Sequence, residues 1–358
     1  QFKTLDLISE IPHVYVHGSA GTGKTFMAIE AARRKYFTGK KVLLIIYNSE
    51  IKEFLKKELY FAKNIGIFSM HEIYKNILGS LEYERMLANN TSQDDFAKAA
   101  LEVNKILPEE EKFDCLIIDE CQDIASFDNL LILQQFINED LQKTEILFFG
   151  DYKFQQVQNK KSLNYENIKK EFLQNLQSIP LYTNCRNTAD IIIDIQRKVE
   201  NDIVSSYKHF LRGDSDEPKL IKTYTYDDNQ NLIEKLISTI KDLKKEGYKS
   251  DDITILARNS QSIKNIFENK KLESFGLTRD PTLRENLVYI STYRKFKGLE
   301  NHIILIIGIE DFGSDFDEFI YIASSRSKDR IISFYQSEFY EKIKLRIKDN
   351  LISKNYDL

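Results

Sequence analysis

Short apolar runs alternate with amphipathic stretches over the first half of the chain. The apolar runs, which predict strands, cover residues 14–17, 42–47, 115–119 and 146–149. The helical patterns cover residues 24–37, 50–61 and 129–141. Strands that alternate with helices predict a parallel sheet that is covered by helices on both faces.

A second series of the same kind fills the rest of the chain. Its strand patterns cover residues 220–223, 253–256, 287–290, 303–307 and 331–334. Its helical patterns cover residues 230–245 and 261–269, followed by a charged amphipathic helix at 338–352. The two series predict two α/β domains, residues 1–182 and 183–358, with a hinge near 180–184. Residues 79–111 are polar and mostly helical in pattern, so we expect a small insertion in the first domain.

The composition is that of a globular protein, with 42% hydrophobic and 30% charged residues in a chain of 358. No apolar run approaches the roughly 18 residues that a membrane helix needs, so we expect no membrane partner. The formal net charge of −4 argues against a protein that coats nucleic acid by charge alone. The three cysteines form no C-x-x-C pair, which predicts reduced thiols in a cytoplasmic protein. The first residue is Gln1 and no leader is visible, so we expect a piece of a longer chain.

Residues 18–25 read GSAGTGKT and join the first apolar run to the first helical pattern. This is the phosphate-loop pattern in its required strand–loop–helix setting. Backbone N–H groups of such a loop wrap a triphosphate, Lys24 would reach its β- and γ-phosphates, and Thr25 would hold Mg²⁺. The expected nucleotide-binding residues are Gly18, Ser19, Ala20, Gly21, Thr22, Gly23, Lys24 and Thr25. The loop predicts an ATP-hydrolysing enzyme with Mg²⁺ as its cofactor.

Acidic residues follow the third apolar run, which reads CLIIDECQD from residue 115 to 123. At the carboxyl end of a parallel strand, Asp119 would lie beside the phosphates and hold Mg²⁺ through water. Glu120 would orient or deprotonate the attacking water. The next strand ends in Gly150 and Asp151, and Gln155 behind them is a candidate sensor of the γ-phosphate, unless this segment is a plain surface turn.

Together these motifs resemble the UvrD/Rep-type superfamily 1 helicases, and further segments continue in the order of that family. These are LYTNCRNT at 181–188, DITILARNSQ at 252–261, STYRKFKGLE at 291–300 and YIASSR at 321–326. The resemblance implies two RecA-like parallel-sheet domains with the nucleotide in the cleft between them. The chain is also similar to minimal helicase modules that are fused behind nuclease-related domains.

The resemblance assigns further residues to the nucleotide. Arg186 and Arg326 correspond to arginines that reach the γ-phosphate, where such a group stabilises charge in the transition state. Gly298 and Glu300, of the K-G-L-E segment, correspond to nucleotide-binding positions, and Gln1 stands where the family reads adenine. Phe26 stands where the family often has an arginine, and Cys185 where it often has a stacking tyrosine.

The same resemblance implies a groove for single-stranded nucleic acid. The expected contacts are Asn48, His71, Thr292, Arg294 and Lys297. The chain has no tryptophan, whereas the family usually stacks an aromatic side chain on a base. Since such stacking contributes about 1–3 kcal/mol per base, we expect a weak grip on the strand.

The sequence therefore predicts an ATP-dependent translocase or helicase acting on single-stranded DNA, with RNA left open. The resemblance implies 3′→5′ polarity, and the missing large insertions predict a minimal motor. One alternative is a regulatory NTPase that licenses a fused or partner nuclease, for example in phage defence, without unwinding. A second alternative is a binding protein that has lost hydrolysis, against which the intact Lys24, Asp119, Glu120 and Arg326 argue.

Overall fold

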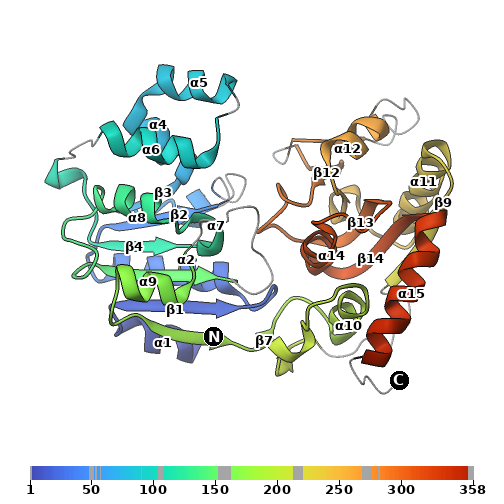
Figure 1. Ribbon diagram of the computed structural model, residues 1–358, viewed down its shortest axis with the longest axis horizontal. Helices are drawn as coiled ribbons and strands as arrows, with labels where there is room; N and C mark the ends of the chain where they lie inside the picture. The colour runs from blue at the N-terminus through green and yellow to red at the C-terminus, as the bar shows by residue number, and fades with distance from the viewer. Residues whose placement is uncertain are drawn as a thin grey trace. The chain divides into compact units, whose positions relative to one another are not determined.

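The chain forms two compact units (Figure 1). The computed structural model describes residues 2–47, 52, 55–56, 58–89, 91–103, 108–151, 163–212, 221–267, 276–280 and 283–353. The first unit comprises Gln1–Gly18 and Gly23–Leu181, and the second comprises Ser19–Thr22 and Tyr182–Leu358. The tip of the phosphate loop, Ser19–Thr22, thus groups with the second unit.

The first unit is built on a six-stranded sheet in which every pair of neighbouring strands is parallel. Its strands are β1 (His13–Gly18), β2 (Val42–Ile46), β3 (Ile65–Ser69), β4 (Cys115–Ile118), β5 (Glu145–Gly150) and β6 (Gln177–Leu181). They are arranged in the order β3-β2-β4-β5-β1-β6. The carboxyl ends of β1, β4 and β5 therefore meet at one edge of the sheet, which is where the sequence places its acidic residues and its phosphate loop.

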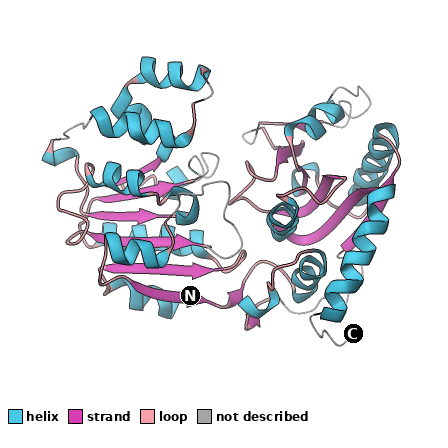
Figure 2. Cartoon of the chain, viewed as in Figure 1, coloured by secondary structure: helices cyan, strands magenta, loops and turns pink. Residues whose placement is uncertain are grey.

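Helices cover this sheet on both faces (Figure 2). They are α1 (Phe2–Ser9), α2 (Lys24–Phe37), α4 (Met70–Leu78), α5 (Ser80–Ala88), α6 (Gln93–Val103), the 3₁₀ turn η1 (Glu109–Glu111), α7 (Cys121–Ile124), α8 (Phe127–Gln134) and α9 (Tyr165–Glu171). Helix α2 packs against β1, β2, β4 and β5, and α1 packs against α2. The expected insertion is formed by α5 and α6, which pack on α4, while α6 also packs on α8.

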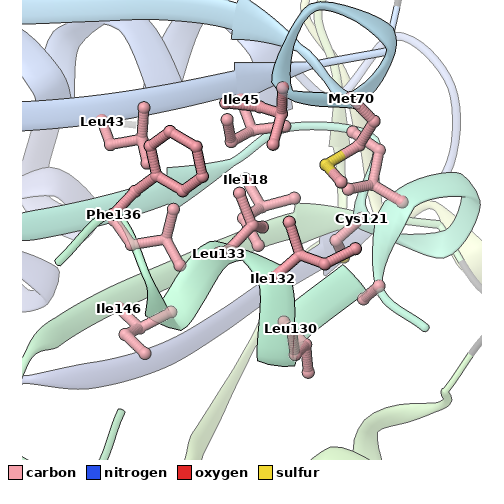
Figure 3. Packing of buried hydrophobic residues seen from close by; sticks show 14 of the residues in the cluster. Leu43, Ile45, Met70, Ile118, Cys121, Leu130, Ile132, Leu133, Phe136 and Ile146 are labelled. Atoms are coloured by element: carbon pink, nitrogen blue, oxygen red, sulfur yellow. The ribbon is translucent and has the colours of Figure 1, made fainter. Parts of the chain in front are cut away.

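One core cluster of the first unit lies between its sheet and the helices α4, α6, α8 and α9, and Figure 3 shows part of it. Alternate residues of the strands enter it, because successive side chains of a strand point to opposite faces. Figure 3 shows Ile118 and Ile146 of the sheet facing Leu133 of α8. The strands are apolar on both faces, as expected for a parallel sheet that is buried on both sides.

The sequence-based prediction of a helix at 129–141 was wrong at its end, since α8 stops at Gln134. The chain then turns and pairs with Phe113, whose N–H donates to the Phe136 carbonyl at 2.9 Å. The Asn138 N–H donates to the Phe113 carbonyl at 2.9 Å in return. Apolar residues that extended the helical pattern are thus buried in a short bridge between chain segments.

The second unit repeats the architecture with its own six-stranded, wholly parallel sheet. Its strands are β9 (Ile221–Tyr226), β10 (Ile253–Ala257), β11 (Leu277–Thr278), β12 (Val288–Thr292), β13 (Asn301–Ile309) and β14 (Ser327–Gln336). Their order is β11-β12-β10-β13-β14-β9. A short parallel pair, β7 (Thr183–Asn184) and β8 (His209–Phe210), lies outside this sheet.

Helices again cover the sheet of the second unit. They are α10 (Ala189–Lys198), the 3₁₀ turns η2 (Val204–Ser206) and η3 (Ser250–Asp252), α11 (Asn229–Lys245), α12 (Ser260–Phe267), α14 (Phe316–Ser325) and α15 (Ser337–Ser353). Helices α11 and α12 share a core with the sheet, and α10 packs against α14 and α15. The two parallel sheets confirm the predicted α/β class with two RecA-like domains. Within the described residues, no helix combines the length and apolarity needed to cross a bilayer.

Candidate nucleotide-binding site

The phosphate loop connects the end of β1 to the first residue of α2. Gly23 has a φ of 84°, a left-handed conformation that favours glycine, and it caps the start of α2. The Lys24 ammonium group donates to the Gly18 carbonyl at 2.7 Å, and the Lys24 side chain is buried. The Thr22 hydroxyl donates to the Ser19 carbonyl at 2.8 Å. Both side chains therefore donate hydrogen bonds to carbonyl groups of the loop itself.

Asp119 follows β4 and lies fully buried beside Thr25, whose hydroxyl donates a hydrogen bond to it. Burial raises the pKa of Asp119, and the neighbouring Glu120 carboxylate raises it further. The Oδ1 atom of Asp119 has no hydrogen-bond partner among the described residues. A buried carboxylate oxygen and a hydroxyl at this point are ligands that suit Mg²⁺. No group of three or more His, Cys, Asp or Glu side chains in the described part of the chain could hold a metal ion by itself.

Glu120 adopts an unusual backbone conformation, with a φ of 50°. Such left-handed conformations are uncommon outside glycine and often occur where a side chain must be aimed at a functional site. Its carboxylate Oε2 accepts a hydrogen bond from Gln122 Nε2 at 2.5 Å. Gln122 Oε1 accepts in turn from the Asp151 N–H at 2.9 Å, and the Gln122 side chain is 1% exposed. Gln122 therefore joins the ends of β4 and β5 and fixes Glu120, a role that we did not predict from the sequence.

His17 is a second residue that sequence reasoning did not single out. It lies in β1 directly before the phosphate loop, and its ring stacks on Tyr15 with centroids 5.3 Å apart. Burial lowers the pKa of His17, and the positive charge of Lys24 lowers it further. Both effects favour the neutral form of the imidazole beside the loop.

In the second unit, the structure brings together two of the predicted residues. The Arg186 Nε donates to the Glu300 carboxylate at 2.5 Å, and Lys328 pairs with the same carboxylate at 2.8 Å. Although burial raises the pKa of Glu300, these two cations outweigh it and lower that pKa to about 2. Glu300 is therefore ionised and shared between Arg186 and Lys328.

Arg326 ends α14 and is 2% exposed. Its Nε donates to the Ile322 carbonyl at 3.2 Å, which holds the guanidinium against its own helix. The Asn187 amide donates to the carbonyls on both sides of Arg326, those of Ser325 at 3.2 Å and Ser327 at 2.7 Å.

The predicted nucleic-acid contacts lie in different environments. His71 of α4 is exposed, yet its ring packs edgewise on aromatic neighbours and its Nδ1 lies 3.1 Å from the Tyr83 hydroxyl. Although the residue as a whole is exposed, partial desolvation of its ring lowers the pKa of His71. Thr292 is half-buried at the end of β12.

Arg294 and Lys297, which follow β12, are less available for binding nucleic acid than we expected. Arg294 pairs with Asp315 at 3.1 Å and lies 3.9 Å from Glu318. Lys297 is only 1% exposed. Gly298 follows them with a φ of 87° in the turn that leads to β13.

Three predicted residues, Gln1, Asn48 and Gln155, lie outside the described part of the chain. Phe26, on the first turn of α2, is 51% exposed. Cys185 is half-buried, and its N–H donates to the Gly21 carbonyl at 2.7 Å.

The family model described as "Schlafen group 3, DNA/RNA helicase domain" matches residues 12–190, which is half of the chain. No curated protein matches it. Among solved structures, arterivirus nonstructural protein 10, a helicase in complex with DNA, has a TM-score of 0.46 and 11% identity, and the match covers 97% of this chain and 65% of that one. The helicase of PRRSV has a TM-score of 0.48 and 10% identity, with coverages of 94% and 55%. The chain thus spans less than two thirds of the length of these viral proteins.

Proposed function

This chain belongs to the Schlafen group 3 DNA/RNA helicase domain family, and from that premise we propose that it hydrolyses ATP to move along single-stranded nucleic acid. Membership of the family confirms the helicase-type domain that the sequence predicted. The proposal is finer: a minimal motor of the UvrD/Rep type, acting on single-stranded DNA with 3′→5′ polarity.

The observation that carries the proposal is the edge of the first sheet where β4 and β5 end. Glu120 is aimed by a left-handed backbone and by Gln122, next to the buried Asp119. In our proposal, Glu120 takes the proton of the attacking water and Lys24 binds the β- and γ-phosphates. Thr25 and Asp119 hold Mg²⁺, which when bound neutralises charge on the phosphate oxygens.

Arg186 and Arg326 complete the proposed catalytic set from the second unit. Each is to place a positive charge on the γ-phosphate, where an arginine of this kind adds about 10³–10⁵ in rate in other NTPases. Arg186 must then exchange Glu300 for the phosphate. Glu300 keeps Lys328 as a partner when it does so, which lowers the cost of the exchange.

The test is the ATP turnover of the full chain with and without single-stranded DNA, with single-stranded RNA as a parallel arm. We expect strong stimulation by DNA, and Glu120→Gln as the control should bind ATP but lose turnover. A rate of ATP turnover that is the same with and without single-stranded DNA or RNA would exclude the motor. Tailed duplexes then test polarity, and faster displacement on 5′ tails would overturn the 3′→5′ assignment.

The predicted nucleic-acid-binding cations are paired or buried, and this favours a second candidate function, a regulatory NTPase that licenses a fused or partner nuclease. Arg294 is already paired with Asp315, and Lys297 is buried. Each phosphate that a protein neutralises adds about −0.7 to the log–log salt slope of single-strand binding. We expect a shallow slope under the first proposal. No measurable binding, together with full basal turnover, would favour the regulatory module.

A further inference from the structure

Within the second unit, two tyrosine hydroxyl groups form hydrogen bonds with the tip of the phosphate loop. The Ala20 N–H donates to the Tyr321 hydroxyl oxygen at 2.7 Å. The Tyr207 hydroxyl donates to the Ala20 carbonyl at 2.8 Å. All three residues are buried, so these contacts are shielded from water.

A phosphate oxygen could replace only one of these two hydrogen-bond partners of Ala20. Backbone N–H groups of a phosphate loop are the donors that bind phosphate oxygens. The Ala20 N–H belongs to this loop, and the Tyr321 oxygen accepts its hydrogen bond. A carbonyl is an acceptor only, so a phosphate cannot replace Tyr207.

A second series of contacts connects the loop tip to Arg326, at the C-terminal end of α14. Gly21 has a φ of 79°, and a Cβ at this position would lie 2.5 Å from the Asn184 side-chain oxygen. That Asn184 oxygen accepts the N–H of Asn187 at 2.9 Å. Asn187 holds the carbonyls on both sides of Arg326. The turn at Asn184–Asn187 thus lies between the loop tip and Arg326.

We propose that Tyr321 is a positioning residue that competes with the nucleotide for the Ala20 N–H and so couples occupancy of the phosphate loop to Arg326. Tyr321 lies in α14, and Arg326, five positions later, is the residue that caps the C-terminal end of this helix. When a phosphate oxygen takes the Ala20 N–H, Tyr321 is released and α14 can shift together with Arg326, which caps its C-terminal end. The inference rests on the proposed function, because it assumes that this loop binds ATP.

The test compares Tyr321→Phe with Tyr207→Phe, which remove one hydroxyl each from opposite sides of Ala20. In Tyr321→Phe, the buried Ala20 N–H loses the tyrosine oxygen as its hydrogen-bond acceptor, so that a nucleotide phosphate meets no competitor for this donor. Mg·ATP should therefore bind about two- to tenfold more tightly, the effect of one neutral hydrogen bond. Its kcat should fall, because α14 no longer responds to the loop. Tyr207→Phe should bind Mg·ATP no more tightly than the wild type.

Calorimetric titration with Mg·ATP gives the Kd values, steady-state turnover gives kcat, and thermal melting checks that both variants are folded. Weaker or unchanged ATP binding by Tyr321→Phe would overturn the proposal, as would equal tightening in both variants. A folded wild-type chain that binds no ATP would instead refute the proposed function, so the two failures can be told apart.

Discussion

Replacing Gln122 with leucine tests how the proposed general base is held. Gln122 lies buried between Glu120 and the end of β5, donating to the first at 2.5 Å and accepting from the Asp151 N–H at 2.9 Å. Leucine has a similar volume and no polar atoms. Gln122→Leu therefore removes these two hydrogen bonds, together with a longer one from Nε2 to Asp123 Oδ2 at 3.4 Å, without opening a large cavity.

The magnitude follows from the two partners that are left behind. A buried N–H without a partner costs about 1–3 kcal/mol, and a hydrogen bond to a charged group contributes about 1.5–3 kcal/mol. The free energy of unfolding should thus fall by about 2.5–6 kcal/mol. If the whole bond to Glu120 serves to aim its carboxylate, turnover should fall about 10- to 150-fold. ATP affinity should stay within about threefold, because the loss concerns the transition state.

The assay is ATP turnover at saturating Mg·ATP, measured at a temperature where the melting curve shows the variant to be folded. A double-mutant cycle with Glu120→Gln isolates the mechanism. Because Gln122 acts through Glu120, Gln122→Leu should cost less than about twofold in the Glu120→Gln background. A folded Gln122→Leu variant with full turnover would refute the reasoning, and so would losses that multiply in the double variant.

The remaining predictions concern the loop, the second unit and helix α4. Lys24→Ala should abolish hydrolysis and weaken ATP binding in a titration, because it removes the charge on the β- and γ-phosphates; near-normal turnover would show that the phosphate loop is misassigned. Since Arg186 and Lys328 lower the pKa of Glu300 from 4.5 to about 2, their stabilisation is present above about pH 4.5 and is lost as the pH falls towards 2. The difference in Tm between the wild type and Glu300→Gln should therefore shrink as the pH is lowered, and a constant difference would contradict the ion pair. His71→Ala should reduce the ratio of ATP turnover with and without single-stranded DNA, whereas an unchanged ratio would leave His71 a structural residue of its aromatic cluster.

The apolar pattern alone predicted the central strands. Strands β2 and β4 read VLLII and CLII, and both are buried throughout, so that each is a continuous apolar run. The strands β3 and β6 at the two edges of the same sheet were missed. β6 reads QSIPL and is largely exposed, and β3 is only partly buried and contains Gly66. An edge strand has a neighbour on one side only, so its sequence need not be uniformly apolar.

Local sequence also placed the phosphate loop, Asp119 and Glu120 correctly at the ends of their strands, because the carboxyl ends of parallel strands lie at one edge. What holds these residues was decided by the tertiary structure. Gln122 acquires its role only when β5 brings the Asp151 N–H beside it, and Arg186 meets Glu300 across 114 residues of chain. The period of apolar residues sets which side of an element is buried, whereas the order of the strands sets which polar groups meet. That order arises from packing over the whole chain, so no short segment of the sequence contains it.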